Sequence, residues 1–375
     1  MKVILCGGGT SGHVNPALNI AAALKKRVPD AEFLFIGTEH GIESTLVPKA
    51  GYPIKFVEVS GFSRKLSFAN LKKNARAAVQ AVTSVRAAKK IIKEFAPDLV
   101  IGTGGYVSWP TVKAAAKRGV PTLIHEQNAF PGVTTKMLAP YVDKICISFD
   151  GSEKYFPESV RENKLVLTGN PIIVDDLTRA QAREQLGLTP DEPYILSYGG
   201  SMGARRVNEL VFELMEKYTG PQSIRHTHAI GRVGYTEFDA IAREKGFYDR
   251  KNLEISEYIY DMALRQAAAD VIICRAGAMT LSELAVRGCA AILIPSPHVT
   301  EDHQYKNARL LADAGAALVY RETELDGDTL VSAVKDLVAN PNKRLRMQTA
   351  IKSFAMRDSA DVIAGCALGL TNAEK

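Results

Sequence analysis

Short apolar segments alternate with helical patterns along the whole of this 375-residue chain, and this alternation restricts the possible folds more than any other feature. The segments lie at residues 2–6, 31–37, 54–59, 98–102, 121–126 and 143–148, and again at 194–200, 224–231, 252–259, 270–277, 290–295 and 316–320. Strands that alternate with helices form parallel sheets with helices on both faces. The length exceeds what one ordinary core holds, so the sequence predicts two α/β domains.

Two glycine-rich segments indicate where ligands bind. GGTSG (8–12) and GGSMG (199–203) each follow an apolar strand and open a helix. We therefore predict two Rossmann-like domains, residues 1–170 and 171–355, and a C-terminal helix (356–375) that packs back on the first domain. Ligands of open parallel sheets bind beyond the carboxyl ends of the strands. The expected site is a cleft with a glycine-rich loop on each wall.

The first glycine-rich segment, CGGGTSGHV (6–14), is suited to holding phosphate. Glycines let the backbone approach a ligand closely, and the helix N-terminus supplies N–H groups and partial positive charge. The segment is not a Walker loop, because His13 follows Gly12 where that loop requires Lys, and it is not the dinucleotide pattern GxGxxG. The alternative is a tight turn whose glycines serve packing alone.

His13 lies in the first turn of the helix that follows this loop. The helix dipole disfavours a cation at that position, so it favours the neutral imidazole that a general base requires. The alternative is a histidine that is hydrogen-bonded inside the loop. The residues alone leave both interpretations open.

The segment CRAGAMTLSELAVRG (274–288) predicts a strand, a turn of small residues and a helix. Thr280 could bond a phosphate at the helix entrance, and Glu283, one turn further, could reach paired ribose hydroxyls. An ordinary helix start with an acidic first turn is the alternative. Gln304 and Asn307 occupy the entry of the next helix.

No metal or disulfide framework is indicated. Asp326 and Asp328 spell a DxD pattern, but they precede a helical stretch, where Asp is a common N-cap. His226 and His228 share one strand face without an evident third ligand, so we interpret them as structural. The five cysteines, at 6, 146, 274, 289 and 366, have neither metal nor disulfide spacing, and no signal peptide is expected. These features indicate a cytoplasmic compartment.

Residues 59–93 form a strongly basic segment. It contains no Asp or Glu, but nine Lys or Arg, at 64, 65, 72, 73, 76, 86, 89, 90 and 93, against a net charge of +6 for the chain. Phe62, Leu66, Phe68 and Leu71 are interleaved with them. This pattern predicts an interfacial helix on an anionic membrane surface, with a solvated helix face as the alternative. No recognition motif supports binding of nucleic acid.

Seven motifs follow one another in a fixed order: GGGTSGHVNPAL, TGGYVSWP, HEQNAFPG, TGNP, GGSMGAR, CRAGAMTLSEL and HQYKNA. Together they resemble the MurG family of glycosyltransferases over essentially the whole chain. The resemblance implies a fold of the GT-B type and inverting transfer of N-acetylglucosamine from UDP-N-acetylglucosamine to undecaprenyl-pyrophosphoryl-N-acetylmuramoyl-pentapeptide, at its C4 hydroxyl. This step converts lipid I to lipid II in peptidoglycan synthesis. The resemblance further implies no cofactor and a peripheral location on the cytoplasmic face of the bacterial cell membrane.

The resemblance also implies roles for individual residues. His13 would be the catalytic base and Glu126 its rival, because inverting transferases often use a carboxylate. Contacts to the two substrates would come from Thr10, Ser11, Gly12, Tyr106, Asn128, Ser201, Ile259, Ala278, Met279, Thr280, Glu283 and Gln304.

Two departures from the family pattern keep alternatives open. Many members carry an Arg shortly after GNP, where this chain has Ile172-Ile173-Val174, and a glycine where it has Trp109. A related transferase with another lipid acceptor is one alternative, and a soluble UDP-sugar epimerase of the same fold is another. A nicotinamide oxidoreductase and a non-enzymatic nucleotide-binding module fit the motifs less well.

Overall fold

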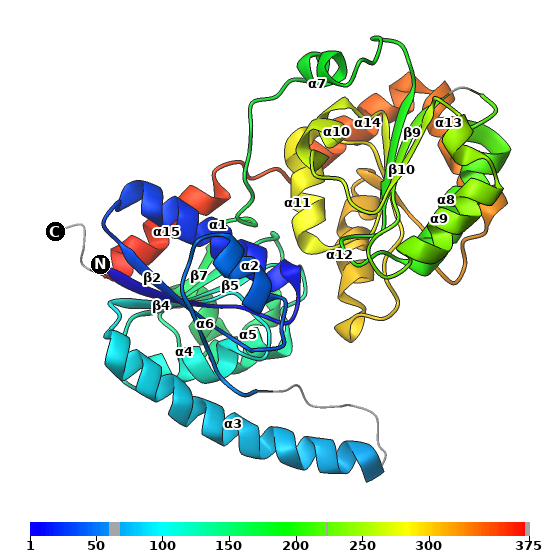
Figure 1. Cartoon of the computed structure of the whole chain (residues 1–375). Helices are drawn as coiled ribbons and strands as arrows, with labels where there is room; N and C mark the ends of the chain where they lie inside the picture. Colours follow the sequence, from blue (N-terminus) through cyan, green and yellow to red (C-terminus); the bar gives the residue numbers. More distant parts are fainter. Residues whose placement is uncertain (60–67, 223, 372–375) are drawn as a thin grey trace. The chain divides into compact units, whose positions relative to one another are not determined.

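The computed structural model describes residues 1–59, 68–222 and 224–371; side chains 68–79, 81 and 82 also lie outside the description. The chain forms two compact units, one made of residues 1–173 and 356–375 and the other of residues 174–355 (Figure 1). Each unit contains one parallel sheet, which confirms the predicted pair of α/β domains.

The sheet of the first unit has seven parallel strands in the order β3-β2-β1-β4-β5-β6-β7. Its strands are β1 (Lys2–Cys6), β2 (Glu32–Gly37), β3 (Ile54–Phe56), β4 (Leu99–Gly102), β5 (Thr122–Glu126), β6 (Lys144–Ile147) and β7 (Leu165–Leu167). Its helices are α1 (Ser11–Arg27), α2 (Glu43–Lys49), α3 (Phe68–Phe95), α4 (Ser108–Ala116), α5 (Val133–Leu138), the 3₁₀ turn η1 (Glu153–Tyr155), α6 (Glu158–Lys164) and α15 (Ser359–Leu370).

Each face of this sheet packs on its own set of helices. On one face, Val14 and Ile20 of α1 and Ile363 and Leu368 of α15 join the core around Leu5. On the other face, α3, α4, α5 and α6 cover the sheet. Helix α15, close to the end of the chain, therefore completes the core of the first unit.

The second unit repeats the arrangement with six parallel strands in the order β10-β9-β8-β11-β12-β13. Its strands are β8 (Tyr194–Tyr198), β9 (Arg225–Ala229), β10 (Leu253–Ser256), β11 (Val271–Cys274), β12 (Ala291–Leu293) and β13 (Ala317–Val319). Its helices are α7 (Arg179–Gln185), α8 (Arg205–Leu214), the π turn η2 (Met215–Thr219), α9 (Tyr235–Glu244), η3 (Phe247–Asp249), α10 (Met262–Ala268), α11 (Ala278–Arg287), η4 (Thr300–Asp302), α12 (His303–Asp313), α13 (Gly327–Ala339) and α14 (Pro341–Lys352).

The predicted strands are all present, and one strand was not predicted. Strand β7 has three residues, lies at the edge of the sheet beside β6 and is only partly buried. So short an edge strand carries no clear apolar pattern. No described helix combines the length and hydrophobicity that crossing a bilayer requires.

The structure confirms that Asp326 caps a helix and that the two strand histidines, His226 and His228, are structural. Asp326 is the N-cap of α13, and its carboxylate accepts a hydrogen bond from the Thr329 N–H at 2.8 Å. His226 Nε2 and His228 Nδ1 each lie 2.8 Å from the Ser197 hydroxyl, and both rings are fully buried. Burial lowers the pKa of His228 to about 3 and that of His226 well below its usual value, so both are neutral parts of the core.

Candidate active site

The order of the strands reverses once in each sheet, and the predicted ligand loops follow the strands at these two points. In the first unit the reversal falls between β1 and β4, where Cys6 lies opposite Gly102. In the second it falls between β8 and β11. Such switch points are where open α/β sheets bind ligands, because the two neighbouring connections leave in opposite directions.

At the first switch point the loops after β1 and β4 contact each other through their backbones. The Gly8 N–H donates to the Gly104 carbonyl at 3.4 Å. A Cβ on Gly105, whose φ is +78°, would lie 2.2 Å from the Gly8 carbonyl oxygen. Glycine is therefore required here for close approach of one loop to the other, in addition to any role toward a ligand.

His13 lies in the first turn of α1, against the loop that follows β4. Its Nδ1 lies 3.1 Å from the Thr103 carbonyl oxygen and 3.1 Å from Gln127 Oε1. The Thr103 hydroxyl donates to the His13 carbonyl at 2.7 Å, and a Cβ on Gly104 would collide with the imidazole ring. The ring is thus held on the Nδ1 side by residues of two other loops.

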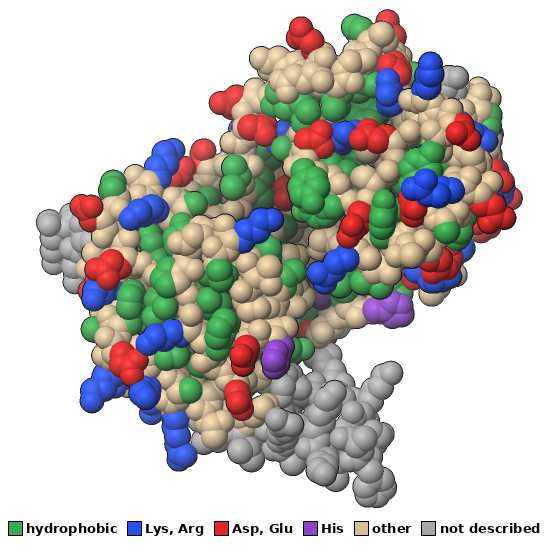
Figure 2. Space-filling model, in the orientation of Figure 1, with side chains coloured by type: hydrophobic (Ala, Val, Ile, Leu, Met, Phe, Trp, Pro, Cys, Tyr) green, Lys and Arg blue, Asp and Glu red, His purple; other side chains and the backbone are tan. Residues whose placement is uncertain are grey.

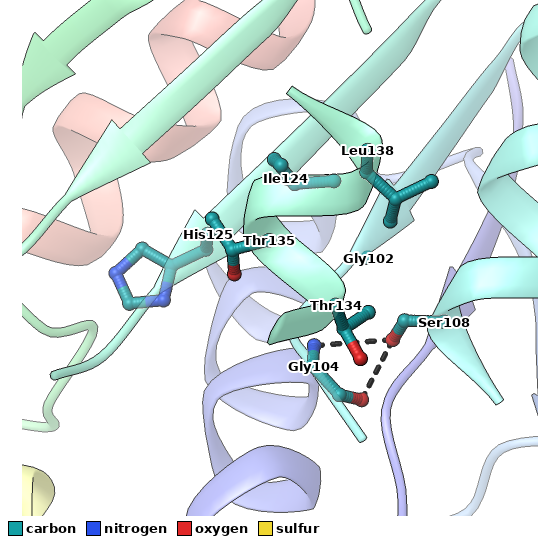
Figure 3. Close-up of a pocket in the computed structure, with 8 residues that line it drawn as sticks. All are labelled: Gly102, Gly104, Ser108, Ile124, His125, Thr134, Thr135 and Leu138. Atoms are coloured by element: carbon teal, nitrogen blue, oxygen red, sulfur yellow. Dashed lines mark hydrogen bonds between the residues drawn. The ribbon is translucent and has the colours of Figure 1, made fainter. Parts of the chain in front are cut away.

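A small pocket opens beside this loop, between α4 and α5 (Figure 3). The Ser108 hydroxyl donates to the Gly104 carbonyl at 2.7 Å and accepts from its N–H at 3.1 Å, which fixes the start of the loop after β4.

Tyr106 is 58% exposed, whereas Trp109, where the family pattern has glycine, packs half-buried against the apolar core.

The carboxylate of Glu126 is 3% exposed and accepts four hydrogen bonds. Oε1 accepts from the N–H of Asn128 at 3.0 Å and from its Nδ2 at 3.1 Å. Oε2 accepts from the Gly132 N–H at 2.9 Å and from the Thr135 hydroxyl at 2.5 Å. This geometry suits a residue that shapes the loop after β5 better than one that takes a proton from a substrate.

Glu43, which the sequence did not indicate, supports the first glycine-rich loop. Its buried carboxylate accepts from the Gly9 N–H at 2.9 Å, and from the N–H and hydroxyl of Thr38 at 2.9 and 2.6 Å. Burial opposes the charged form, but the hydrogen bonds outweigh it and lower the pKa of this carboxyl. Because Gly9 donates to Glu43, an anion at this loop would depend on the N–H groups of residues 10–12.

In the second unit, the loop after β8 is joined to the loop after β9. The Arg232 N–H donates to the Ser201 carbonyl at 3.2 Å, and a Cβ on Gly203, whose φ is +85°, would lie 2.4 Å from the Ile230 carbonyl oxygen. The exposed Arg232 guanidinium contacts the Met202 sulfur at 3.5 Å. No carboxylate among the described residues pairs with Arg232, which brings positive charge to the loop that contains Ser201.

Glu283 lies in the second turn of α11, after the loop that follows β11. Burial raises the pKa of its carboxyl, while Gln266, with Nε2 at 3.5 Å, and Arg287 oppose the shift. Gln304 accepts from the Ser296 N–H at 2.9 Å, which joins α12 to the loop after β12. Ile259 is buried in the loop after β10.

The structure therefore gathers the predicted residues into one set per unit, each at the carboxyl edge of its sheet. The first set is Thr10, Ser11, Gly12, His13, Tyr106, Glu126 and Asn128. The second set is Ser201, Ile259, Ala278, Met279, Thr280, Glu283 and Gln304. Gln127, Glu43 and Arg232 were not predicted, although Gln127 lies inside the HEQN motif.

These two parallel-sheet units, each with its site at a switch point, define a two-domain nucleotide-sugar enzyme of the GT-B class. The glycosyltransferase family 28 N-terminal domain matches residues 3–147, and the glycosyltransferase family 28 C-terminal domain matches residues 194–363. The chain belongs to glycosyltransferase family 28 and, within it, to the MurG group.

Relatives and solved structures agree with this assignment. The UDP-N-acetylglucosamine–N-acetylmuramyl-(pentapeptide) pyrophosphoryl-undecaprenol N-acetylglucosamine transferase of Acetivibrio thermocellus is 45% identical, over 97% of this chain and 96% of its own. The Bacillus cytotoxicus protein of the same name is 41% identical over 96% and 97%. The crystal structure of Acinetobacter baumannii MurG matches with a TM-score of 0.76 and 30% identity, over 98% of this chain and 99% of its own. Staphylococcus aureus MnaA, at 15% identity and a TM-score of 0.69, shares the fold alone.

Proposed function

We propose that this chain transfers N-acetylglucosamine from UDP-N-acetylglucosamine to the C4 hydroxyl of lipid-linked N-acetylmuramoyl-pentapeptide, the step of peptidoglycan synthesis that its MurG relatives are named for. The acceptor oxygen attacks the anomeric carbon as the bond to the diphosphate breaks, and UDP leaves with the bonding electron pair. The configuration at the anomeric carbon is inverted.

The observation that carries the chemistry is the position of His13. Its ring stands at the first switch point with Nδ1 between two oxygen acceptors, which leaves Nε2 as the nitrogen that takes the hydroxyl proton. The N-terminus of α1 has no side-chain cap from Thr10 and no acidic residue in its first turn, which suits it to a diphosphate. Tyr106 and Asn128 then contact the sugars.

On the donor side, Glu283 accepts hydrogen bonds from the ribose hydroxyls and Ser201 contacts the diphosphate. Arg232 supplies positive charge beside Ser201 and compensates for the Arg that the family pattern has after Pro171. The first turn of α11, with Ala278, Met279 and Thr280, completes the nucleotide-sugar contacts together with the backbone of Ile259 and with Gln304.

UDP release tests this function against its alternatives. The assay supplies UDP-N-acetylglucosamine with and without lipid-linked muramoyl-pentapeptide. We expect UDP release only with the lipid, and a product that carries both sugars. Acceptor-independent formation of UDP or of an epimer would instead indicate the epimerase, and activity with a lipid lacking the muramoyl sugar would indicate another acceptor.

Glu283→Gln should weaken donor binding. A carboxylate that accepts ribose hydroxyls contributes more than an amide, so we expect KM for UDP-N-acetylglucosamine to rise by roughly 10- to 100-fold. Steady-state kinetics with saturating lipid acceptor measure this change. Glu244→Gln, at an exposed position on α9, is the matched control. An unchanged KM in Glu283→Gln would exclude the ribose contact.

We also propose that the first unit binds an anionic membrane through the basic segment 59–93, on the cytoplasmic face of the cell membrane. Residues 60–67 and the side chains of 68–79, 81 and 82 fall outside the described part of the chain. They include all five basic residues of the segment before residue 80, at 64, 65, 72, 73 and 76. Arg86, Lys89, Lys90 and Lys93 are exposed on the described part of α3. On the face of the second unit seen in Figure 2, acidic and basic side chains are interspersed.

The double variant Lys89→Gln/Lys93→Gln should bind vesicles of phosphatidylglycerol and phosphatidylcholine at least about tenfold more weakly, because each basic side chain near such a surface contributes about 1 kcal/mol. Sedimentation with vesicles measures the affinity. Lys251→Gln/Arg346→Gln, exposed in the second unit, provides the control. Equal loss of binding in both variants would contradict a specific role for α3.

A further inference from the structure

The groups that surround Nδ1 of His13 determine which nitrogen of the neutral ring carries the proton. Both the Thr103 carbonyl oxygen and Gln127 Oε1 lie 3.1 Å away. A carbonyl oxygen only accepts hydrogen bonds, so Nδ1 must carry the proton to interact with Thr103. The same tautomer suits Gln127 only if its amide oxygen, and not its NH₂ group, faces the ring.

The orientation of the Gln127 amide follows from its contacts with His125. Gln127 Nε2 lies 3.0 Å from the His125 carbonyl oxygen and 2.9 Å from His125 Nδ1. The carbonyl can only accept, so the NH₂ group must face His125 and the amide oxygen must face His13. Exchange of the two amide atoms would place two acceptors against each other on one side and break a hydrogen bond on the other.

The His125 ring is arranged consistently. Its Nε2 lies 3.0 Å from the Gly169 carbonyl oxygen, which requires a proton on Nε2 and leaves Nδ1 free to accept from Gln127. The ring is 1% exposed, and burial lowers the pKa of His125 to about 4. His125 therefore stays neutral near pH 7. The hydrogen bonds all run in one direction: His13 Nδ1 donates to Gln127 Oε1, Gln127 Nε2 donates to His125 Nδ1, and His125 Nε2 donates to the Gly169 carbonyl.

We propose that Gln127 is a positioning residue that holds His13 in the Nδ1–H tautomer, so that Nε2 is presented unprotonated to the acceptor hydroxyl. This inference rests on the proposed function. A neutral amide orients the imidazole but adds no negative charge. A carboxylate at the same place would also stabilise the imidazolium ion. Within the described residues, no carboxylate lies within ion-pair distance of His13. The contact with Gln127 therefore orients the base through a hydrogen bond and brings no negative charge to it.

NMR of the full chain with ¹⁵N-labelled histidine reports which ring nitrogen is protonated, and His13→Asn assigns the His13 signals by their disappearance. We expect the proton on Nδ1 in the wild type and partial conversion to the Nε2–H form in Gln127→Met. The same variant should lose about tenfold in kcat with KM for UDP-N-acetylglucosamine nearly unchanged, since orientation of the base acts on the chemical step. Thr111→Val, which removes a buried hydroxyl inside α4, is the control for a polar group lost from this unit.

Gln127→Glu gives a result that a merely structural role would not produce. The carboxylate keeps an acceptor at the same place but stabilises the imidazolium ion, so the acidic limb of the kcat–pH profile should move to higher pH. A proton on Nε2 in the wild type, or an unchanged tautomer in Gln127→Met, would overturn the positioning role. Full activity of His13→Asn would overturn the proposed base instead, so the two failures are distinguishable.

Discussion

Replacement of His13 by asparagine lowers kcat by roughly 10²- to 10⁴-fold, the contribution expected of a positioned general base. Asparagine places an NH₂ group near the position of Nδ1 and can still donate to Thr103 or Gln127, but it has no basic nitrogen in place of Nε2. The measurement is kcat for UDP release at saturating concentrations of both substrates.

Two controls make the His13 result specific. His40→Asn, at an exposed position of the first unit, should retain wild-type kcat. Binding of UDP to His13→Asn should stay close to that of the wild type, because the contacts predicted for uracil and ribose lie in the second unit and the substitution keeps the backbone N–H groups of α1. If kcat of His13→Asn stays within about threefold of wild type, the base is another group. Glu126→Gln is then the next variant to measure, although the four hydrogen bonds that Glu126 accepts come from the loop after β5 and from α5.

Mild acid destabilises the second unit through its two buried histidines. His226 and His228 are neutral in the folded state, since burial lowers the pKa of both, to about 3 for His228. In the unfolded chain each takes up a proton near pH 6.5, so below that pH the unfolded state binds more protons. Stability is therefore fully present above about pH 6.5 and falls as the pH decreases, by roughly 1.4 kcal/mol per pH unit for each histidine.

Hydrogen exchange measured between pH 7 and pH 5 gives the free energy of unfolding of each unit separately. This free energy should fall by about 3 kcal/mol per pH unit in the second unit. In the first unit, whose buried histidine is His125, it should fall by about half as much. His228→Gln should reduce the slope of the free energy of unfolding against pH in the second unit by the contribution of one proton, even if the variant is less stable at pH 7. His298→Gln, exposed in the same unit, should leave the slope unchanged. A slope that is unaffected by His228→Gln would show that another group takes up the proton.

Several features of the fold could be predicted because they depend on neighbours along the chain. Apolar runs such as residues 2–6 and 194–198 became buried strands, and the DxD pattern became a helix cap, because burial periodicity and capping are local properties. Strand β7 was missed for the same reason: it has three residues, none of them fully buried, and so short a segment forms no pattern.

The candidate site could be predicted only in part. The glycine-rich loops and His13 were visible in the sequence, as was Glu126 within HEQN. Glu126 nevertheless saturates its carboxylate with residues 128–135, in the loop after β5 and the first turn of α5. Its neighbour Gln127, by contrast, reaches a residue 114 positions earlier in the chain. Glu43 contacts Gly9 across 34 positions. No short-range pattern indicates such partners.

The sequence by itself determined the alternation of strands and helices, the glycine loops that open α1 and follow β8, and the family to which the motifs belong. Only the tertiary structure decided which loops lie side by side, because the strand orders β1-β4 and β8-β11 join segments far apart in the chain. It also decided which nitrogen of His13 is free. That depends on the acceptors Thr103 and Gln127, and a hydrogen bond has a direction only once both of its partners are in place.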